Sequence, residues 1–251
     1  MKILFKLKIP PSQTIYFGEP EDEKEKEEMF ALRFKVYSSR NYIEDSSYPN
    51  KLEVDNYDLE NKCVYFIAKF DNILVGSIRV IRDYYLPTEK ECFEFEEPEE
   101  IKYICRNNRL ELSRLIAIPP SENKYFPRHL IMIFLLYCCL LYAKENNIKG
   151  GYAFIKSKLE KKLKKINIPF KRILKYKQIY PPNGPLFKYF NNPHDPVVPI
   201  YYLTDDIEEW FNGFLRKYFF ILKENNINEF VLNKNKFNLF LFISFLKNVF
   251  K

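Results

Sequence analysis

The stretch that most constrains this chain is Leu110 to Ile118, because it reads as a buried strand that carries Glu111, Ser113 and Arg114 within an apolar run. Burying these three polar groups is costly unless they are paired or hydrogen-bonded. Alternate side chains of a strand share a face, so Glu111 and Ser113 are expected to point one way and Arg114 the other, unless a bulge redirects it. The stretch is therefore either a wall of an active site or a structural ion pair, and taken alone it favours the ion pair.

The composition sets broad limits on the class of protein. At 251 residues and 47% hydrophobic content, the chain can bury one large core, and its net charge of +7 favours an acidic partner. The five cysteines lack C-x-x-C spacing and there are only two histidines, so no disulfide framework, metal site or Ser-His-Asp triad is predicted. A reducing cytoplasm fits this cysteine usage, and no N-terminal signal peptide is expected.

The hydrophobic pattern predicts strands alternating with helices, which indicates an α/β fold with a central mixed sheet flanked by helices. The strand at 152–155 is expected to be the parallel neighbour of Leu110 to Ile118, across the apolar helix 128–146. The remaining predicted elements are a strand at 1–9, a helix around 29–37, a hairpin of 63–70 with 73–82, a helix at 157–166 and a basic strand near 171–177.

The C-terminal part is predicted to be a helical extension, residues 204–251, packed on the domain formed by residues 1–203. Thr204-Asp205-Asp206 caps a helix expected to run to about Leu222. The apolar segment Phe237 to Phe250 is interpreted as a final packing helix, with a peripheral membrane contact as the alternative.

Four motifs occur in register with this order of elements: Arg33, Glu53-x-Asp55-x-Tyr57-Asp58, Gly76-Ser77-Ile78-Arg79 and Glu111-Leu112-Ser113-Arg114. Together they resemble one branch of the acetyltransferase-like (GNAT) fold: the autoinducer synthases that make acyl-homoserine lactones and the related N-acyl amino acid synthases. The stretch Tyr180 to Leu203 is similar to the acyltransferases associated with exosortase (PEP-CTERM) systems. The resemblance implies an acyltransferase that moves a fatty acyl group from a thioester to the amine of an amino acid or related acceptor.

Two departures from the family pattern bear on the substrates. Autoinducer synthases usually carry a tryptophan after the first helix, where Tyr42 stands here, so the acceptor is left open. Coenzyme A-dependent members usually have a glycine-rich loop, and Pro119 to Arg128 contains no glycine. The expected donor is therefore the phosphopantetheine thioester of an acidic acyl carrier protein, with acyl-coenzyme A as the alternative and no bound cofactor. The basic segment Lys156 to Lys177 offers a complementary surface.

The resemblance also assigns roles. Glu111 is the expected base for the acceptor amine, with Ser113 beside it, and backbone N–H groups near Leu115 or Ile116 are expected to polarise the thioester carbonyl. The acceptor wall comprises Arg33, Asp55, Asp58, Arg79 and Arg114, with Arg79 expected to hold a carboxylate. Donor contacts are assigned to Leu115, Ile116, Arg128, Lys161, Lys162 and Lys165. The acyl chain is expected to lie between the central strand and its neighbour, lined by the helix 130–141.

Three other interpretations remain open. The first is an acyl-homoserine lactone synthase that uses S-adenosylmethionine. The second is a non-enzymatic basic binding module, for instance for nucleic acid, although only Tyr176 and the basic residues around it suit one, and we expect no nucleic-acid partner. The third is an inactive acyltransferase-like protein, which thiol release from an acyl donor would distinguish from an enzyme.

Overall fold

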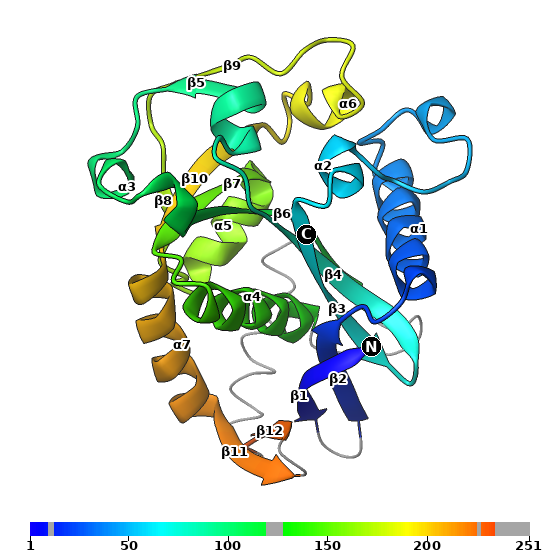
Figure 1. The fold of residues 1–251 in the computed structure, drawn as a ribbon, viewed down its shortest axis with the longest axis vertical. Coiled ribbons are helices and arrows are strands. Elements are labelled where there is room, and N and C mark those ends of the chain that lie inside the picture. Colours follow the sequence, from blue (N-terminus) through cyan, green and yellow to red (C-terminus); the bar gives the residue numbers. More distant parts are fainter. Residues whose placement is uncertain (10–12, 119–127, 225–226, 234–251) are drawn as a thin grey trace.

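The computed structural model describes residues 1–9, 13–118, 128–224 and 227–233 (Figure 1). The main sheet contains β1 (Lys2–Ile9), β2 (Gln13–Glu19), β3 (Cys63–Phe70), β4 (Ile73–Ile81), β6 (Arg109–Ala117), β7 (Gly150–Lys156), β8 (Lys171–Arg172), β10 (Val197–Leu203), β11 (Phe219–Glu224) and β12 (Ile227–Leu232). Their order across the sheet is β11-β12-β1-β2-β3-β4-β6-β7-β10-β8. Two neighbouring pairs, β1 with β12 and β6 with β7, are parallel, so the sheet is mixed.

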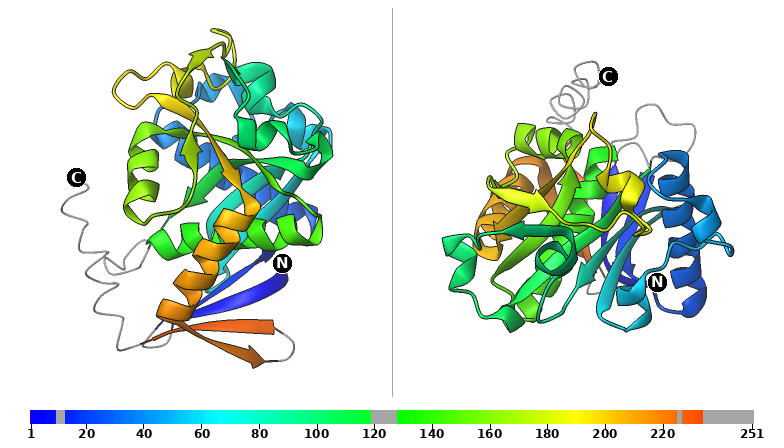
Figure 2. Two further views of the ribbon diagram at one scale, coloured as in Figure 1. Left: turned by 90° about the vertical axis from the view of Figure 1, so that its left-hand side faces the viewer. Right: turned by 90° about the horizontal axis from the view of Figure 1, so that it is seen from above.

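Helices cover both faces of this sheet (Figures 1 and 2). The helices are α1 (Glu23–Ser39), α2 (Asn56–Leu59), α3 (Glu99–Lys102), α4 (Arg128–Glu145), α5 (Ser157–Lys165), α6 (Phe187–Phe190) and α7 (Thr204–Tyr218). A small second sheet pairs β5 (Phe93–Phe95) with β9 (Tyr176–Gln178). None of the described helices is long and apolar enough to cross a bilayer.

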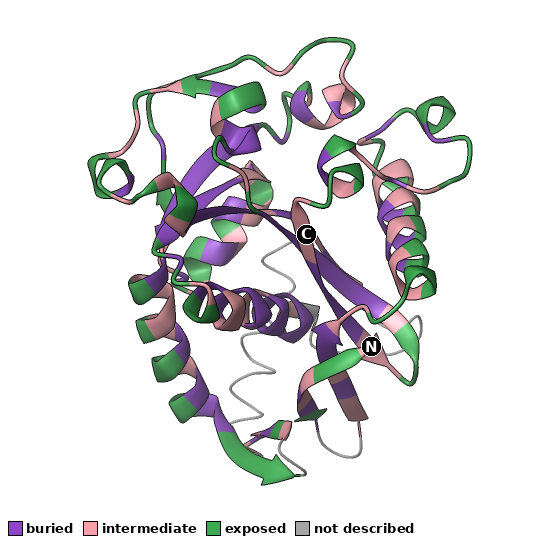
Figure 3. Cartoon of the chain, viewed as in Figure 1, coloured by how far each residue is buried: buried purple, intermediate pink, exposed green. Residues whose placement is uncertain are grey.

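The alternation of side chains along β3 separates the two faces. Phe66 and Ala68 belong to the main core, which α4 and α7 cover, whereas Tyr65 and Ile67 pack against Met29 of α1. Successive strand residues point to opposite faces, so α1 and α4 lie on opposite sides of the sheet. The central strands are accordingly buried along most of their length (Figure 3).

The structure confirms most of the predicted elements. The first strand, the hairpin, the helix after residue 128 and the parallel strand beside β6 form within one to three residues of their expected limits. In the hairpin turn, Asp71 and Asn72 have φ values of 48° and 62°. This is the left-handed pair that a two-residue turn requires, and Asp and Asn tolerate it better than most residues.

The C-terminal part differs from the prediction. Helix α7 ends at Tyr218, not near Leu222, and the apolar residues that follow form β11 and β12, which extend the main sheet through β1. Phe219 and Phe230 join the main core, so pairing with β1 and burial decide the conformation of a run that periodicity alone leaves ambiguous. The segment Phe237 to Phe250 lies outside the described residues.

Candidate active site

The site begins where β6 and β7 part. Their parallel pairing extends only from Arg109 opposite Gly150 to Leu112 opposite Ala153. Beyond these residues β6 stays paired with β4 as far as Ala117, and β7 stays paired with β10 as far as Lys156. The sheet therefore opens between two strands that are each held from the other side.

A β-bulge on β6 accompanies this opening. Ser77 and Arg79 of β4 pair with Ile116 and Ser113, so one residue on β4 faces two on β6. Arg114 lies in the bulge with φ of 54°, a left-handed conformation that costs about 1–2 kcal/mol for a residue with a Cβ. The bulge turns Arg114 to the same side of the sheet as Ser113, which simple alternation along the strand would not do.

The bulge brings Arg114 into a buried charge network, which consists of the guanidinium groups of Arg33, Arg79 and Arg114 and the carboxylates of Glu53, Asp55 and Asp58. Arg33 of α1 donates from Nε to Glu53 at 2.6 Å and from Nη2 to Asp58 at 2.9 Å. Arg33 and Glu53 are fully buried. Arg33, predicted on the first helix, thus connects α1 to Glu53 in the loop before α2 and to Asp58 within α2.

The other two arginines bind the same loop to the sheet. Arg79 donates from Nη1 to Asp55 at 2.6 Å and from Nε to the hydroxyl of Ser113 at 3.0 Å. Arg114 donates from Nε to Glu53 at 2.9 Å and from Nη2 to Asp55 at 2.8 Å. Two carboxylates of the network, those of Asp55 and Asp58, already bind Nη1 of Arg79. That Arg79 also holds a substrate carboxylate stays a prediction.

The local sequence explains why the loop presents its acids to the arginines. Asp55 caps α2 by accepting from the backbone N–H groups of Tyr57 at 3.1 Å and Asp58 at 3.3 Å, while Asp58 accepts from the backbone N–H of Asp55 at 3.0 Å. This reciprocal capping box fixes the backbone of a helix too short to be stable alone. Tyr65 of β3 also donates to Asp58, at 2.9 Å.

The network keeps its carboxylates ionised. Burial raises the pKa of Glu53, but the guanidinium groups of Arg114 and Arg33 outweigh burial and hold this pKa below its usual range. The same balance lowers the pKa of Asp55 and of Asp58. Glu53 is the member that the sequence-based site set omitted, although it begins the predicted acidic motif.

Glu111 occupies a different environment. Its side chain is fully buried, Oε2 accepts from the backbone N–H of Thr88 at 2.7 Å, and Oε1 has no hydrogen-bond partner among the described residues. Burial raises the pKa of Glu111 to about 8. The hydrogen bond from Thr88 and the charges of Arg79 and Arg114 lower this pKa, but their effect is smaller than that of burial. A carboxyl group poised near neutral pH can accept and release a proton.

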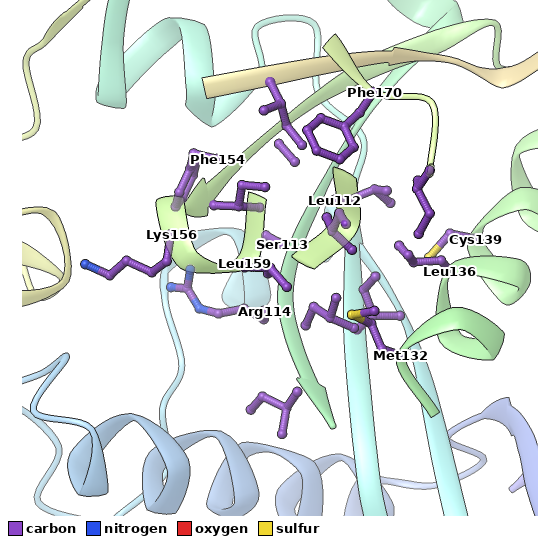
Figure 4. Close-up of a pocket in the computed structure, with 18 of the residues that line it drawn as sticks. Leu112, Ser113, Arg114, Met132, Leu136, Cys139, Phe154, Lys156, Leu159 and Phe170 are labelled. Carbon is purple, nitrogen blue, oxygen red and sulfur yellow. The ribbon is translucent and has the colours of Figure 1, made fainter. Parts of the chain in front are cut away.

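A cavity of about 430 Å³ fills the space between the parted strands (Figure 4). Its apolar lining includes Leu112 of β6, Phe154 of β7 and the α4 residues Met132, Leu136 and Cys139. At one side Figure 4 shows the side chains of Arg114 and Lys156 together, away from the α4 residues. The volume and mixed lining suit a ligand that has a long apolar part and a polar end.

The predicted site residues divide between the cavity and its surroundings. Ser113, Arg114, Leu115, Ile116 and Lys162 line the cavity. In the described part of the chain, Glu111 and the other members of the predicted set do not. The side chain of Arg128 lies outside the described part.

Sequence reasoning missed part of the polar side of the cavity. Lys156, Tyr42 and Tyr189 line it together, and Lys156 lies with its ammonium 4.3 Å from the ring centroid of Tyr189. Tyr42 and Tyr189 are 147 residues apart in the sequence. Their ring centroids lie 5.0 Å apart because α6 packs beside the end of α1. The sequence contains no signal for this contact beyond the number of tyrosines.

Helix α5 presents the unpaired part of the predicted basic surface. Glu160 neutralises Lys164 and Arg172, and Glu100 and Glu94 pair with Lys171 and Lys177. Within the described residues, Lys158, Lys161 and Lys162 form no ion pair. These three lysines of α5 place part of the remaining basic character beside the cavity, while exposed Lys175 lies between β8 and β9.

The chain was compared with known proteins. A family model described as N-acyl amino acid synthase FeeM matches residues 28–182. This span contains all four sequence motifs, the parted strands and α5. By sequence, no curated protein matches the chain.

Solved structures share the architecture. The AHL synthase LasI has a TM-score of 0.55 and 16% identity over 80% of this chain and 95% of that chain. FeeM, an N-acyl amino acid synthase from uncultured soil microbes, has a TM-score of 0.53 and 16% identity over 81% and 96%. TofI, solved in a ternary complex with an inhibitor and MTA, has a TM-score of 0.55 and 15% identity over 77% and 96%. At these identities the likeness shows the fold alone, and it confirms the predicted α/β fold class.

The charge network predicts a large effect of removing one carboxylate. The Glu53→Gln variant leaves two buried guanidinium groups undercompensated, so we expect unfolding in urea to show a loss of about 3–5 kcal/mol. The matched control is Glu44→Gln, which breaks a surface pair with Lys188 and should cost under about 1 kcal/mol. Equal losses in the two variants would contradict a supporting role for the network.

The environment of Glu111 predicts a pH-dependent effect on stability. Its pKa is raised from 4.5 to about 8 on folding, so the folded state binds this proton more tightly and loses stability as the pH rises through that window. The Glu111→Gln variant lacks this titration. We therefore expect the difference in melting temperature, variant minus wild type, to increase as the pH is raised from 4.5 to about 8. Circular dichroism at a series of pH values measures it. A difference that stays constant over this range would show that the Glu111 pKa is not raised.

Proposed function

This chain belongs to the family of the N-acyl amino acid synthase FeeM and is an acyltransferase that transfers an acyl group to an amine, and we propose that its substrates are a fatty acyl thioester of acyl carrier protein and an amino acid. The observation that carries this proposal is the cavity between β6 and β7. Strand β6 supplies part of its wall, including the polar groups Ser113 and Arg114, and the same strand carries Glu111, which is buried beside the cavity lining.

The lining of the cavity supports a fatty acyl group as the transferred unit. The α4 side chains Met132, Leu136 and Cys139 line it together with Leu112, and an alkyl group among them gains about 0.8 kcal/mol for each buried methylene. This agrees with the expectation that the acyl chain of the substrate lies beside the helix 130–141. A short acetyl group would leave most of this apolar surface without contacts.

The basic part of α5 supports a carrier protein as donor. Lys158 and Lys162 line the cavity and Lys161 is exposed beside them, so a negatively charged carrier bound to α5 would have its phosphopantetheine arm close to the opening. The chain also lacks glycine between Pro119 and Arg128, where coenzyme A-dependent relatives usually have a loop for pyrophosphate.

The proposed reaction forms an amide bond and breaks a thioester bond. The acceptor must first lose a proton from its ammonium group, and Glu111 takes this proton directly or through a water molecule. The amine attacks the thioester carbonyl, the developing oxyanion is stabilised by backbone N–H groups at Leu115 or Ile116, and the thiol of the carrier leaves with a proton. Ser113, which accepts from Arg79, hydrogen-bonds the acceptor or the leaving group.

The charge network positions the parts of this site. Asp55 and Asp58 hold Arg79, and Arg79 in turn holds the hydroxyl of Ser113 at the cavity. Arg114 is the network member that lines the cavity, so it is better placed than Arg79 to meet a bound substrate.

The first test of this mechanism is the Glu111→Gln variant. We expect acyl transfer, followed by thiol release and by mass spectrometry of the N-acylated product, to fall by about 100-fold or more because the base is lost. The kcat/KM of the wild type should rise through about pH 8, where Glu111 loses its proton, and the variant should lack this limb. The matched control is Glu229→Gln, a buried glutamate on β12 outside the cavity. Near-normal turnover of the Glu111 variant would remove this residue as base.

The second test concerns the donor. Reversing the charges of Lys161, Lys162 and Lys165 should raise the KM for acyl carrier protein about tenfold at low ionic strength, and by less as salt is added. Reversal of the exposed Lys24, Lys35 and Lys51, which lie away from α5, provides the matched control. If both triple variants use the carrier protein equally well, the donor binds elsewhere on the molecule.

A further inference from the structure

Lys156 is a buried cation that forms no ion pair with any carboxylate of the described residues. It is the last residue of β7, its exposed fraction is 5%, and its ammonium group donates to the backbone oxygens of Tyr189 and, at 3.0 Å, of Asp195. In the described part of the chain, each of the four buried arginines has a carboxylate partner, whereas Lys156 has none. Buried charges in proteins are normally paired, so an anion is missing here.

The nearest carboxylate is already committed. Oδ1 of Asp195 accepts from the hydroxyl of Ser157 at 3.0 Å and from the backbone N–H of Lys158 at 2.9 Å, which caps the start of α5. Burial lowers the pKa of Lys156 to about 8, and the charge of Asp195 offsets only part of this change. Among the described residues, the protein therefore compensates the ammonium group only in part.

The cavity gives an anion access to this group. A lysine ammonium has three donor hydrogens, and two backbone oxygens account for two of them. Lys156 lines the cavity beside Arg114, whose Nε and Nη2 bind Glu53 and Asp55 (Figure 4). On this side of the cavity a ligand thus meets the buried ammonium group of Lys156 next to a guanidinium group that is already paired.

We propose that Lys156 binds the carboxylate of the amino acid portion of the substrate and product, which makes it a specificity-determining residue. This inference rests on the proposed function. The ammonium of Lys156 lies 5.2 Å from the ring centroid of Tyr42 and 4.3 Å from that of Tyr189, and Tyr37 of α1 stacks on Tyr189, so the ammonium lies on the α1 side of the cavity with the charge network. The donor is assigned to the α5 side, where Lys158 and Lys162 stand.

The test compares two ligands that differ only in charge: N-dodecanoylglycine and its neutral primary amide. Isothermal titration calorimetry should show that the wild type prefers the acid. The Lys156→Met variant keeps the length of the side chain, and we expect it to bind the acid on the order of 10- to 100-fold more weakly and the amide as the wild type does. The matched control is Lys188→Met on α6, a half-buried lysine bonded to Asn41 and Glu44 outside the cavity lining, which should change neither affinity.

Other outcomes overturn the inference. If Lys156→Met weakens both ligands equally, the lysine only fixes the segment that carries Tyr189 and Asp195. If the variant keeps the preference for the acid, the carboxylate binds elsewhere. A third comparison uses dodecanoyl-pantetheine with and without its phosphate group. If Lys156→Met weakens binding of the phosphorylated compound alone, the anion that Lys156 binds belongs to the acyl donor. A wild type that binds neither N-acyl compound and transfers no acyl group refutes the proposed function as well, whereas intact transfer with an unchanged variant refutes the role of Lys156 alone.

Discussion

The structure depends on the pairing of three buried guanidinium groups with three carboxylates, of which only that of Asp55 is partly exposed. Neither set can leave water alone, because an unpaired charge in the interior costs several kcal/mol. Arg33 comes from α1, Arg79 from β4 and Arg114 from the bulge of β6, while the three acids come from the segment that begins α2. Helix, loop and central strands are therefore fixed to one another by ionic contacts as well as by apolar packing. The left-handed backbone of Arg114 is stabilised by the two carboxylates that this conformation allows it to reach.

The same arrangement separates two kinds of carboxyl group. Glu53, Asp55 and Asp58 face arginines, which keep them ionised despite burial. Glu111 lies on the same strand as Arg114 but pairs with one backbone N–H group, and burial raises its pKa to about 8. An ionised acid paired with arginine is suited to hold structure, whereas an acid poised near neutral pH is suited to exchange protons with an amine. The environment, and not the residue type, thus distinguishes the positioning carboxylates from the proposed base.

The cavity has a corresponding division of its walls. The side formed by α4 is apolar, the side near α1 holds Arg114 and Lys156, and α5 adds lysines without carboxylate partners in the described chain. A ligand with an alkyl chain and a charged end matches this arrangement, and so does delivery of the chain by an acidic carrier. Parting of β6 and β7 creates the space, since each strand keeps its other neighbour and the sheet remains stable around the opening.

Much of this could be predicted from the sequence. The order of elements before residue 219, the parallel partner of β6 and the hairpin follow from hydrophobic period and turn chemistry, which act over short distances along the chain, and the family resemblance pointed to the four motifs. Only the tertiary structure decided that residues 219–232 form strands, because their partner β1 lies at the opposite end of the sequence. It also decided that Glu53 completes the network, that the bulge turns Arg114 toward Ser113, and that Lys156 meets Tyr42 and Tyr189 at the cavity. Pairing, burial and counterions depend on which distant residues come together, and no local pattern in a sequence contains that information.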